Sequence, residues 1–209
     1  MGSNFQIYSV MTILPIAYFP SIHYLKEYFS DPSTNLEIHE NFVKQTIRNR
    51  CEILSGNGIL RLSIPLSHSN GIKIKTKDIR IDFGKSWQMN HWRAIKSAYA
   101  AAPYFEDYEQ QINQILLAKD EFLIDKNQRI FEFLFSILEI NKIISYTKTY
   151  TEETERDFRT NDFLKSSFVI KEYQQVFSYG KEFSSNLSMI DLLMNEGPFI
   201  RNWILTNRD

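Results

Sequence analysis

The sequence has little cysteine: Cys51 is its one thiol in 209 residues. A single cysteine cannot form an intramolecular disulfide, which excludes the disulfide-stapled class of secreted domains and fits a reducing, cytoplasmic compartment. Basic neighbours would lower the pKa of the Cys51 thiol. No signature of a cysteine nucleophile surrounds it, however, and we expect a buried packing residue at this position.

Histidine and glycine are also scarce, with four and seven residues. No two histidines have the spacing of a zinc site, so we expect no metal centre. The phosphate-binding patterns Gly-x-x-x-x-Gly-Lys and Gly-x-Gly-x-x-Gly are absent, as is the Gly-x-Ser-x-Gly elbow of serine hydrolases. The sequence therefore identifies no cofactor.

Long hydrophobic runs are absent too. Residues 5–25 hold no charged side chain, but Thr12, Pro15 and Tyr18 make the stretch too polar to cross about 30 Å of hydrocarbon. The stretch also lacks the basic start and the small-residue cleavage site of a signal peptide. The net charge is -1, and the basic residues form no long stripe. We therefore expect neither a membrane span nor nucleic-acid binding.

Apolar and aromatic residues are plentiful. The chain is 43% hydrophobic and 23% charged, with 16 Phe and 11 Tyr. This balance is typical of a globular protein with a sizeable core. At this length we expect one domain over residues 1–209. These quantities do not specify an oligomeric state.

The N-terminal part has the pattern of a strand–helix unit. Residues 7–14 are rich in Ile, Val and Thr, which is typical of a central strand. A short helix is predicted next, with Ile22, Leu25 and Phe29 on one face. A second strand follows at residues 35–39.

The middle of the chain has turn signals and alternating apolar residues. Gly56-Asn57-Gly58 predicts the turn of a hairpin that joins residues 50–54 to residues 59–66. Asn70-Gly71 predicts another turn. The strand after it is predicted by the alternation of Ile79, Ile81 and Phe83.

Helical spacing dominates the second half. Three apolar stripes predict three helices, and Pro103 ends the first, because proline lacks the backbone donor that a helix needs. A capping box of Ser188 and Asp191 predicts a helix that stops at Gly197, and Pro198 starts the last helix. The three stripes are Trp92, Ile95, Tyr99 and Ala102; Tyr104, Tyr108, Ile112 and Ile115; and Ile130, Phe131, Leu134, Ile137 and Leu138.

Two connecting segments complete the prediction. Residues 143–146 have the composition of a short strand, and residues 149–165 are polar enough to predict a long exposed loop. Together the elements predict an α/β fold with α+β character. It has an N-terminal strand–helix unit, central antiparallel hairpins and a mostly helical C-terminal half.

One short run gathers Lys44, Arg48 and Arg50 against a single acid, Glu40. Arg and Lys bind carboxylate or phosphate, and neighbouring amide groups fix the orientation of the ligand. In a strand these three cations would share one face, because side chains alternate with period two. We therefore predict that at least two of them converge with Asn49 on a concave surface that binds a small anion. The alternative is a solvated charged face.

This run is one of several motifs that together resemble a known family. In chain order they are Tyr18-Phe19-Pro20, His39-Glu40-Asn41, Lys44-Gln45-Thr46-x-Arg48-Asn49-Arg50-Cys51, Trp87-x-x-x-His91-Trp92 and Asn186-Leu187-Ser188-x-x-Asp191-Leu192-Leu193-x-Asn195-Glu196-Gly197-Pro198. From residue 9 to residue 204 the chain resembles the WbqC-like family, whose members occur in bacterial surface-polysaccharide gene sets. Leu14-Pro15-Ile16-Ala17 departs from the family's usual Gln-Pro-Tyr-Phe-like start, and His23 stands where a glycine is usual.

The resemblance implies a role in the biosynthesis of O-antigen or capsule glycans. It implies a group transferase that uses an activated anionic donor, such as a nucleotide sugar or an activated acyl compound. Aminoacyl (glycine) transfer is one form of this activity. The alternative is a non-catalytic binding or scaffolding protein of the same pathway, because no base and nucleophile pair is evident in the sequence. The expected substrate-binding residues are Tyr18, Lys44, Gln45, Arg48, Asn49 and Arg50.

Two residues are catalytic candidates. His91 stands near the start of a predicted helix, where a histidine can act as a general acid or base or hold a phosphate. We predict that it lies at the same cleft as Arg50 and that the N-terminus of its helix points there. Asp191 is the second candidate. Each residue has a structural alternative. His91 can be a packed histidine beside Trp92, and Asp191 can be the acid of a capping box.

Overall fold

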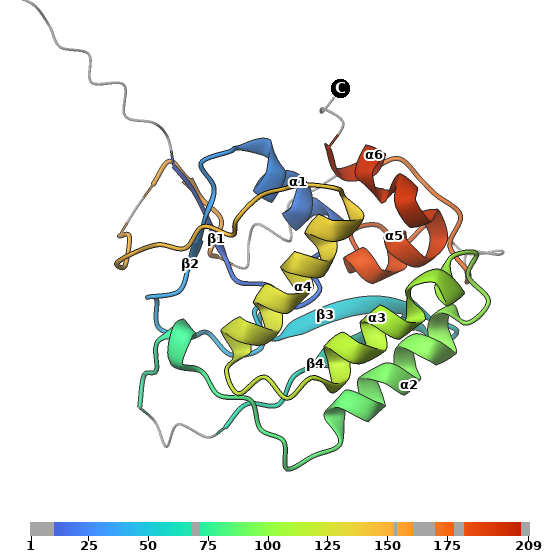
Figure 1. The fold of residues 1–209 in the computed structure, drawn as a ribbon, viewed down its shortest axis with the longest axis horizontal. Coiled ribbons are helices and arrows are strands. Elements are labelled where there is room, and N and C mark those ends of the chain that lie inside the picture. Colours follow the sequence, from blue (N-terminus) through green and yellow to red (C-terminus); the bar gives the residue numbers. More distant parts are fainter. Residues whose placement is uncertain (1–10, 68–71, 153, 161–169, 178–181, 206–209) are drawn as a thin grey trace, which may run out of the picture.

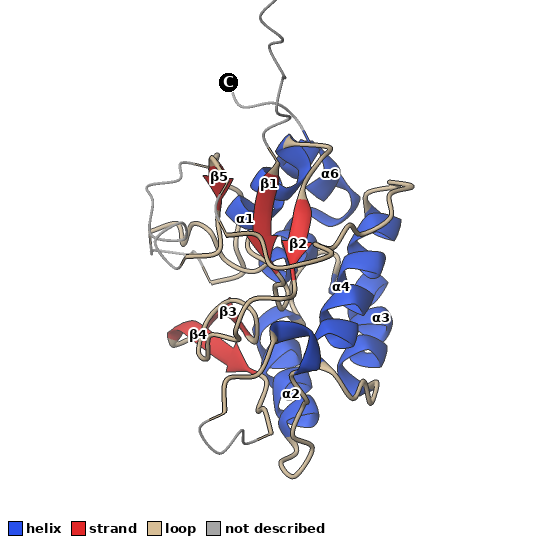
Figure 2. Cartoon of the chain, turned by 90° about the vertical axis from the view of Figure 1, so that its left-hand side faces the viewer, coloured by secondary structure: helices blue, strands red, loops and turns tan. Residues whose placement is uncertain are grey.

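The computed structural model describes residues 11–67, 72–152, 154–160, 170–177 and 182–205. Two small sheets and a set of helices form a mixed architecture (Figure 1). Figure 2 shows the sheet of β1, β2 and β5 above the hairpin of β3 and β4, with α3 and α4 along one side. The expected α/β fold with α+β character is confirmed, including the mostly helical C-terminal half.

The first sheet is parallel and has the order β2-β1-β5. Strands β1 (Thr12–Pro15) and β2 (Asn35–Glu37) are joined by α1 (Ile22–Ser30), which is the expected strand–helix unit. Every residue of β1 is buried, as is usual for the central strand of a parallel sheet. The predicted strand at residues 7–14 overlaps β1, and its first residues lie outside the described part of the chain.

Helix α1 has a clear physical origin in the sequence. Ser21 is its N-cap, and the side chain accepts a hydrogen bond from Tyr24 N, which satisfies one of the free donors of the first turn. Ile22 and Leu25 are fully buried on its inner face, and Phe29 packs against the core. The predicted apolar face is therefore confirmed.

The segment predicted as an exposed loop at residues 149–165 contributes strand β5 (Arg156–Asp157). β5 pairs in parallel with β1, with Thr12 opposite Arg156. The loop prediction is therefore wrong at β5, because polar composition does not reveal a strand that is held by backbone hydrogen bonds and ion pairs. Residues 153 and 161–165 lie outside the described residues.

The second sheet is the predicted hairpin. β3 (Arg50–Ser55) pairs antiparallel with β4 (Gly58–Ser63), with Ser55 opposite Gly58 at the turn. Gly58 has φ +104°, a conformation that favours glycine. The turn prediction from Gly56-Asn57-Gly58 is confirmed.

The second predicted hairpin is reduced to isolated bridges. Residues after the turn form a short 3-10 helix, η1 (Thr76–Asp78), and Ile81 makes a single antiparallel bridge to Leu66. Ile79 and Ile81 are buried, whereas Phe83 is exposed. The alternation thus predicted burial correctly at Ile79 and Ile81 but not at Phe83, and the pairing does not extend into a strand.

Two smaller expectations concern connecting segments. The predicted strand at residues 143–146 is absent from the structure, and Tyr146 makes only one parallel bridge, to Leu36. The turn at Asn70-Gly71 lies outside the described residues.

The three predicted helices are α2 (Trp87–Tyr99), α3 (Phe105–Leu117) and α4 (Leu123–Ile137). All residues of the three predicted stripes are buried or half-buried. The chain leaves the helical conformation before Pro103, as expected. The stripes therefore predicted both the helices and the faces that they bury.

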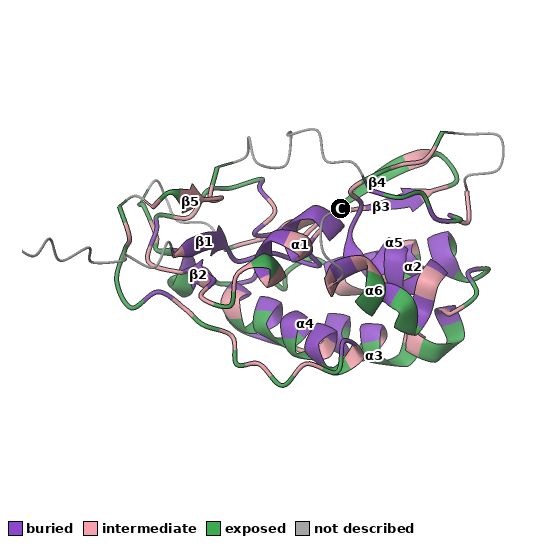
Figure 3. Cartoon of the chain, turned by 90° about the horizontal axis from the view of Figure 1, so that it is seen from above, coloured by how far each residue is buried: buried purple, intermediate pink, exposed green. Residues whose placement is uncertain are grey.

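The C-terminal helices are α5 (Met189–Glu196), the 3-10 turn η3 (Gly197–Phe199) and α6 (Ile200–Leu205). Gly197 ends α5 with φ +55°, and a Cβ at this position would overlap the ring of Tyr104. The predicted stop is confirmed. Figure 3 shows α5 buried along nearly its whole length, whereas α3 and α4 alternate buried and exposed faces.

The predicted capping box is wrong in one half. Ser188 caps α5, because its side chain accepts from Ile190 N. Asp191 does not complete the box, since Ser188 N donates to the Glu52 carbonyl instead. The Asp191 carboxylate turns toward other buried donors.

Among the residues that the structure describes, no helix is both long and apolar enough to cross a membrane.

Candidate functional site

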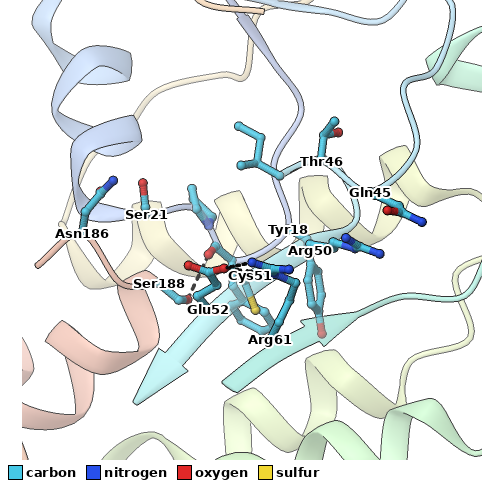
Figure 4. Close-up of a pocket in the computed structure, with 13 residues that line it drawn as sticks. Tyr18, Ser21, Gln45, Thr46, Arg50, Cys51, Glu52, Arg61, Asn186 and Ser188 are labelled. Carbon is cyan, nitrogen blue, oxygen red and sulfur yellow. Dashed lines mark hydrogen bonds and ion pairs between the residues drawn. The ribbon is translucent and has the colours of Figure 1, made fainter. Parts of the chain in front are cut away.

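A cavity of 360 Å³ lies where the loop after β1, the loop before β3, the hairpin and the start of α5 meet (Figure 4). Segments that are far apart in the sequence therefore form one site. The lining residues are Tyr18, Phe19, Pro20, Ser21, Gln45, Thr46, Ile47, Arg50, Cys51, Glu52, Arg61, Asn186 and Ser188.

The cationic run does not form a strand before Arg50. Residues 42–49 are turns and loop, and Gln45 has φ +63°. The period-two argument therefore does not apply, and the three cations point to different surroundings. Arg50 lines the cavity, Lys44 is exposed outside its lining, and Arg48 is buried. The expected convergence of at least two of these cations is wrong for this reason.

Arg48 is an interior ion-pair residue with 1% of its surface exposed. It lies 2.6 Å from the Glu40 carboxylate and also donates to Thr46 Oγ1 and to the Arg159 carbonyl. Desolvation by burial raises the pKa of Glu40, and Arg48 opposes this shift. Arg48 thus holds the loop that carries Thr46 at the cavity.

Asn49 is buried as well and does not line the cavity. Its side-chain amide donates to the Ile64 carbonyl at 3.0 Å. This bond joins the start of β3 to the residue after β4, so the contact that the structure gives Asn49 is an internal one.

Arg50 is the cation that the structure places at the cavity. Its Nε is buried, and no described residue accepts a hydrogen bond from it. In Figure 4 the side chains of Arg50 and Gln45 point to one end of the cavity, away from Ser21 and Asn186. A buried N–H of a guanidinium without an acceptor is costly to leave unpaired. Because the positively charged Arg50 also lines the cavity, this end suits an anion.

A second arginine, Arg61, lies on the neighbouring strand. It donates through Nε and Nη2 to Glu52 Oε1, at 3.0 and 2.6 Å. Glu52 and Arg61 are directly opposite in the hairpin register, so they share a face. The carboxylate at the cavity is thus already held by a cation.

The other end of the cavity is formed where α1 and α5 begin. Ser21 and Ser188 make an antiparallel bridge between the two helix starts. Ile22 N donates to the Leu187 carbonyl at 3.3 Å, and Met189 N donates to the Pro20 carbonyl at 2.8 Å. Each helix start thus satisfies a first-turn donor of the other, which leaves fewer backbone N–H groups for a ligand.

Tyr18 links the cavity to His91. Tyr18 is one of the lining residues, and its hydroxyl lies 2.9 Å from His91 Nδ1. Burial lowers the pKa of His91 to about 4, and a hydrogen bond to the backbone of Ser63 opposes the shift. His91 is therefore neutral at pH 7.

The structure connects His91 with Arg50 only indirectly. Ser63, which bonds His91, is paired with Arg50 in the hairpin. No residue of α2 is among those that line the cavity, so His91 is not part of the lining, and the orientation of the N-terminus of α2 toward the cavity stays a prediction. Trp87 packs edge-on against His91, with 5.1 Å between the ring centroids.

Asp191 is fully buried and lies outside the cavity lining. It accepts hydrogen bonds from the hydroxyls of Tyr99 and Tyr173, at 2.9 and 2.6 Å, and from Gln175 Nε2 at 2.8 Å. Desolvation raises the pKa of Asp191, and the three donors oppose this shift. The carboxylate joins α2 and α5 to the segment at residues 170–177.

Cys51 lines the cavity with little exposed surface. Burial and the neighbouring Glu52 raise the pKa of the thiol, and a hydrogen bond with Ser188 opposes the shift only partly. The expected lowering by basic neighbours is therefore wrong, because desolvation outweighs them. The thiol stays protonated at pH 7, which is the opposite of what a nucleophile needs.

Several lining residues were missed by the sequence-based site prediction. Ser21 was not singled out in the sequence, Asn186 was recognised only as part of a motif, and Arg61 stood in an ordinary predicted strand. Their shared position depends on long-range contacts that no local pattern reveals.

Within the described ranges there is no group of three His, Cys, Asp or Glu side chains that could hold a metal ion.

Comparison with known proteins gives two similarities. The WbqC-like protein family matches residues 17–167, a range that includes Tyr18, Arg50 and His91 but not Asn186. An uncharacterized protein of Mycobacterium tuberculosis (strain ATCC 25618 / H37Rv), Rv1507c, is 26% identical over 110 residues, which cover 52% of this chain and 47% of that relative. The aligned region thus spans less than half of the relative's length. No solved structure matches the chain. Because the family match covers well over half of the sequence, the chain belongs to the WbqC-like protein family.

Proposed function

We propose that this protein binds a small anionic metabolite of surface-polysaccharide assembly in the cavity at Arg50. The observation that carries the proposal is that Arg50 lines the cavity while no described residue accepts a hydrogen bond from its buried Nε, so that no partner in the described part of the chain neutralises this guanidinium. An arginine with a free N–H is a strong recognition group for phosphate or carboxylate. Gln45 adds an amide at the same end.

The size and lining of the cavity support a small ligand. Its volume of 360 Å³ is within the range of pockets for metabolites, at the lower end. Most of the lining residues are polar or charged in type, whereas Tyr18 and Phe19 are almost fully buried. This combination suits a compact, hydroxyl- or acyl-bearing anion better than a polymer.

The pathway comes from the family. Members of the WbqC-like family occur in bacterial surface-polysaccharide gene sets, and the donors used in such assembly are activated anions such as nucleotide sugars. In a group transfer, Arg50 would hold the anionic part of the donor and stabilise charge that develops on its leaving group. Lys44, exposed beside the cavity, would contribute through long-range attraction only.

The alternative function, a non-catalytic binding protein of the same pathway, is favoured by a specific observation. Among the described lining residues, no free nucleophile lies beside a general base. The Cys51 thiol is held protonated, Ser188 Oγ donates to the Phe19 carbonyl, and the Tyr18 hydroxyl is engaged with His91. A transferase built on this cavity would therefore use a nucleophile that belongs to the acceptor substrate.

A ligand screen followed by a turnover assay tests the proposal. Thermal shift of the full chain would be measured with nucleotide sugars, acyl phosphates and adenylates, and hits would be followed by calorimetry. We expect one anionic class to stabilise the protein, because a ligand that binds only the folded state raises its stability. Turnover of that ligand with an acceptor would favour the transferase, and binding without turnover would favour the binding protein. If no anion stabilised the chain, the proposed function would be wrong.

A further inference from the structure

The end of the cavity opposite Arg50 offers hydrogen-bond donors. Asn186 and Ser21 both line it, and Figure 4 places their side chains together there. Each of these side chains has an acceptor and a donor. The hydrogen bonds with α1 decide which of the two remains free for a ligand.

Backbone N–H groups of α1 bond to the acceptor atoms of both side chains. His23 N donates to Asn186 Oδ1 at 3.1 Å, and Tyr24 N donates to Ser21 Oγ at 3.4 Å. Because a backbone N–H can only donate, the first contact fixes the orientation of the Asn186 amide without ambiguity. The Asn186 Nδ2 hydrogens and the Ser21 hydroxyl hydrogen have no acceptor within the described residues.

The backbone of Asn186 supports this arrangement. Its φ is +56°, in the left-handed region that Asn and Asp tolerate better than other residues with a side chain. The amide is thus held by an unusual backbone conformation and by a bond to α1. A side chain held in two ways can act as a fixed donor.

Donors also dominate the rest of the cavity. Arg50 contributes a guanidinium to the lining, whereas the one carboxylate among the lining residues, Glu52, is bonded to Arg61. A ligand with acceptor oxygens at both ends would satisfy these groups. A ligand with an ammonium group at the Asn186 end would meet the donors of Asn186 and Ser21, and the Glu52 carboxylate in the lining already binds Arg61 through Oε1.

We propose that the cavity selects an anion whose second end is a neutral, oxygen-rich group, such as the hydroxyls of a sugar phosphate, and that Asn186 sets this selectivity. This inference rests on the proposed function, because it assumes that Arg50 holds the anion. It favours a sugar-type donor over an aminoacyl donor with a free ammonium group. Asn186 is a specificity-determining residue in this arrangement, and Ser21 is its helper.

The test compares two phosphate esters by calorimetry with the full chain. Glucose 1-phosphate carries hydroxyls, phosphoethanolamine carries an ammonium group, and inorganic phosphate reports the anion end alone. We expect the native protein to bind glucose 1-phosphate at least roughly tenfold more tightly than phosphoethanolamine, since several donors are satisfied only by the sugar.

The matched variant is Asn186→Asp. Aspartate keeps the shape, tolerates the left-handed backbone and still accepts from His23 N, so the first turn of α1 keeps this hydrogen bond. It replaces the free donors with a carboxylate oxygen. Relative to inorganic phosphate, we expect glucose 1-phosphate to lose roughly tenfold in affinity and phosphoethanolamine to gain, so that the preference narrows or reverses. Asn90→Asp, at an exposed position on α2, controls for the added charge.

The outcomes separate this inference from the proposed function. If Arg50→Ala abolishes phosphate binding but Asn186→Asp leaves the preference unchanged, the inference is overturned and the anion site stands. Equal or tighter binding of phosphoethanolamine by the native protein overturns the inference as well. If neither ester nor phosphate binds at millimolar concentration, the inference is overturned, and the ligand screen described above decides the proposed function. Melting temperatures of both variants confirm that each is folded before its binding is compared.

Discussion

The guanidinium of Arg48 lies 2.6 Å from the carboxylate of Glu40, and both side chains are buried. The sequence places Arg48 in a run that suggests ligand binding, but its N–H groups are used inside the protein. They bond to Glu40, Thr46 and the Arg159 carbonyl, which joins the loop before β3 to the segment that carries β5. Arg48 is bonded within the protein and does not line the cavity, whereas Arg50 does.

Arg48→Ala should therefore impair folding. Removal of one partner leaves the Glu40 carboxylate buried without its cation, which typically costs about 3–5 kcal/mol of unfolding free energy. Urea unfolding followed by circular dichroism measures this loss. The double variant Glu40→Gln with Arg48→Met should cost less than Arg48→Ala, because no uncompensated charge remains. A stable Arg48→Ala protein that has lost only ligand binding would show that Arg48 contacts the ligand.

Arg50→Ala should have the opposite effect. The variant loses a charge-assisted contact with the ligand, which is worth about 1.5–3 kcal/mol, so affinity should fall roughly 10- to 150-fold. Its melting temperature without ligand should change little, because Arg50 Nε has no partner in the described structure. Calorimetry with the best anion of the screen measures the change.

Arg93→Ala is the matched control for Arg50→Ala. Arg93 is exposed on α2 and does not line the cavity, so the same loss of charge should leave affinity nearly unchanged. Equal losses in the two variants would mean that overall charge, rather than Arg50, attracts the ligand.

His91 should make the protein less stable in mild acid. Its pKa is about 4 in the folded protein, against 6.5 in the unfolded chain. Between these two values the unfolded chain binds a proton that the folded protein does not, so stability falls as the pH is lowered from 6.5 to 4. The full effect is about 3 kcal/mol, at about 1.4 kcal/mol for each pKa unit.

His91→Gln removes this dependence and keeps a polar partner for Tyr18. The difference in unfolding free energy between the native protein and His91→Gln should be constant above the ordinary pKa of histidine and should change below it. NMR titration of the imidazole provides a direct reading of the pKa. An imidazole that titrates near its ordinary value would contradict the burial described here.

Asp191 should contribute to the stability of the fold rather than to catalysis. In Asp191→Asn, the amide nitrogen would face one of the donors of Tyr99, Tyr173 or Gln175 in place of an acceptor oxygen. A buried donor left unsatisfied costs about 1–3 kcal/mol, and we expect that loss in urea unfolding. Tyr173→Phe, which removes one donor, should cost about 1 kcal/mol. Asp191→Asn at full stability but without activity would instead assign Asp191 to catalysis.

Local signals in the sequence predicted the regular elements well. Apolar stripes at helical spacing specified α2, α3 and α4, because the face that a helix buries is written in its own residues. The turn at Gly58 and the stop at Gly197 were readable because each needs a backbone conformation that favours glycine. Elements held by long-range pairing were harder: β5 consists of two polar residues, Arg156 and Asp157.

The candidate site required the tertiary structure. The sequence determined that Lys44, Arg48 and Arg50 are close along the chain, but not which of them faces solvent, a partner or a cavity. That depends on where the acceptors lie: Glu40 and the Arg159 carbonyl for Arg48, and no described residue for Arg50 Nε. Likewise, Asn186 becomes a donor at the cavity only because α1, more than 160 residues earlier, uses its oxygen. The sequence determines the charge and the hydrogen-bonding capacity of each side chain. The fold decides which partner each side chain bonds to, and therefore which groups remain free for a ligand.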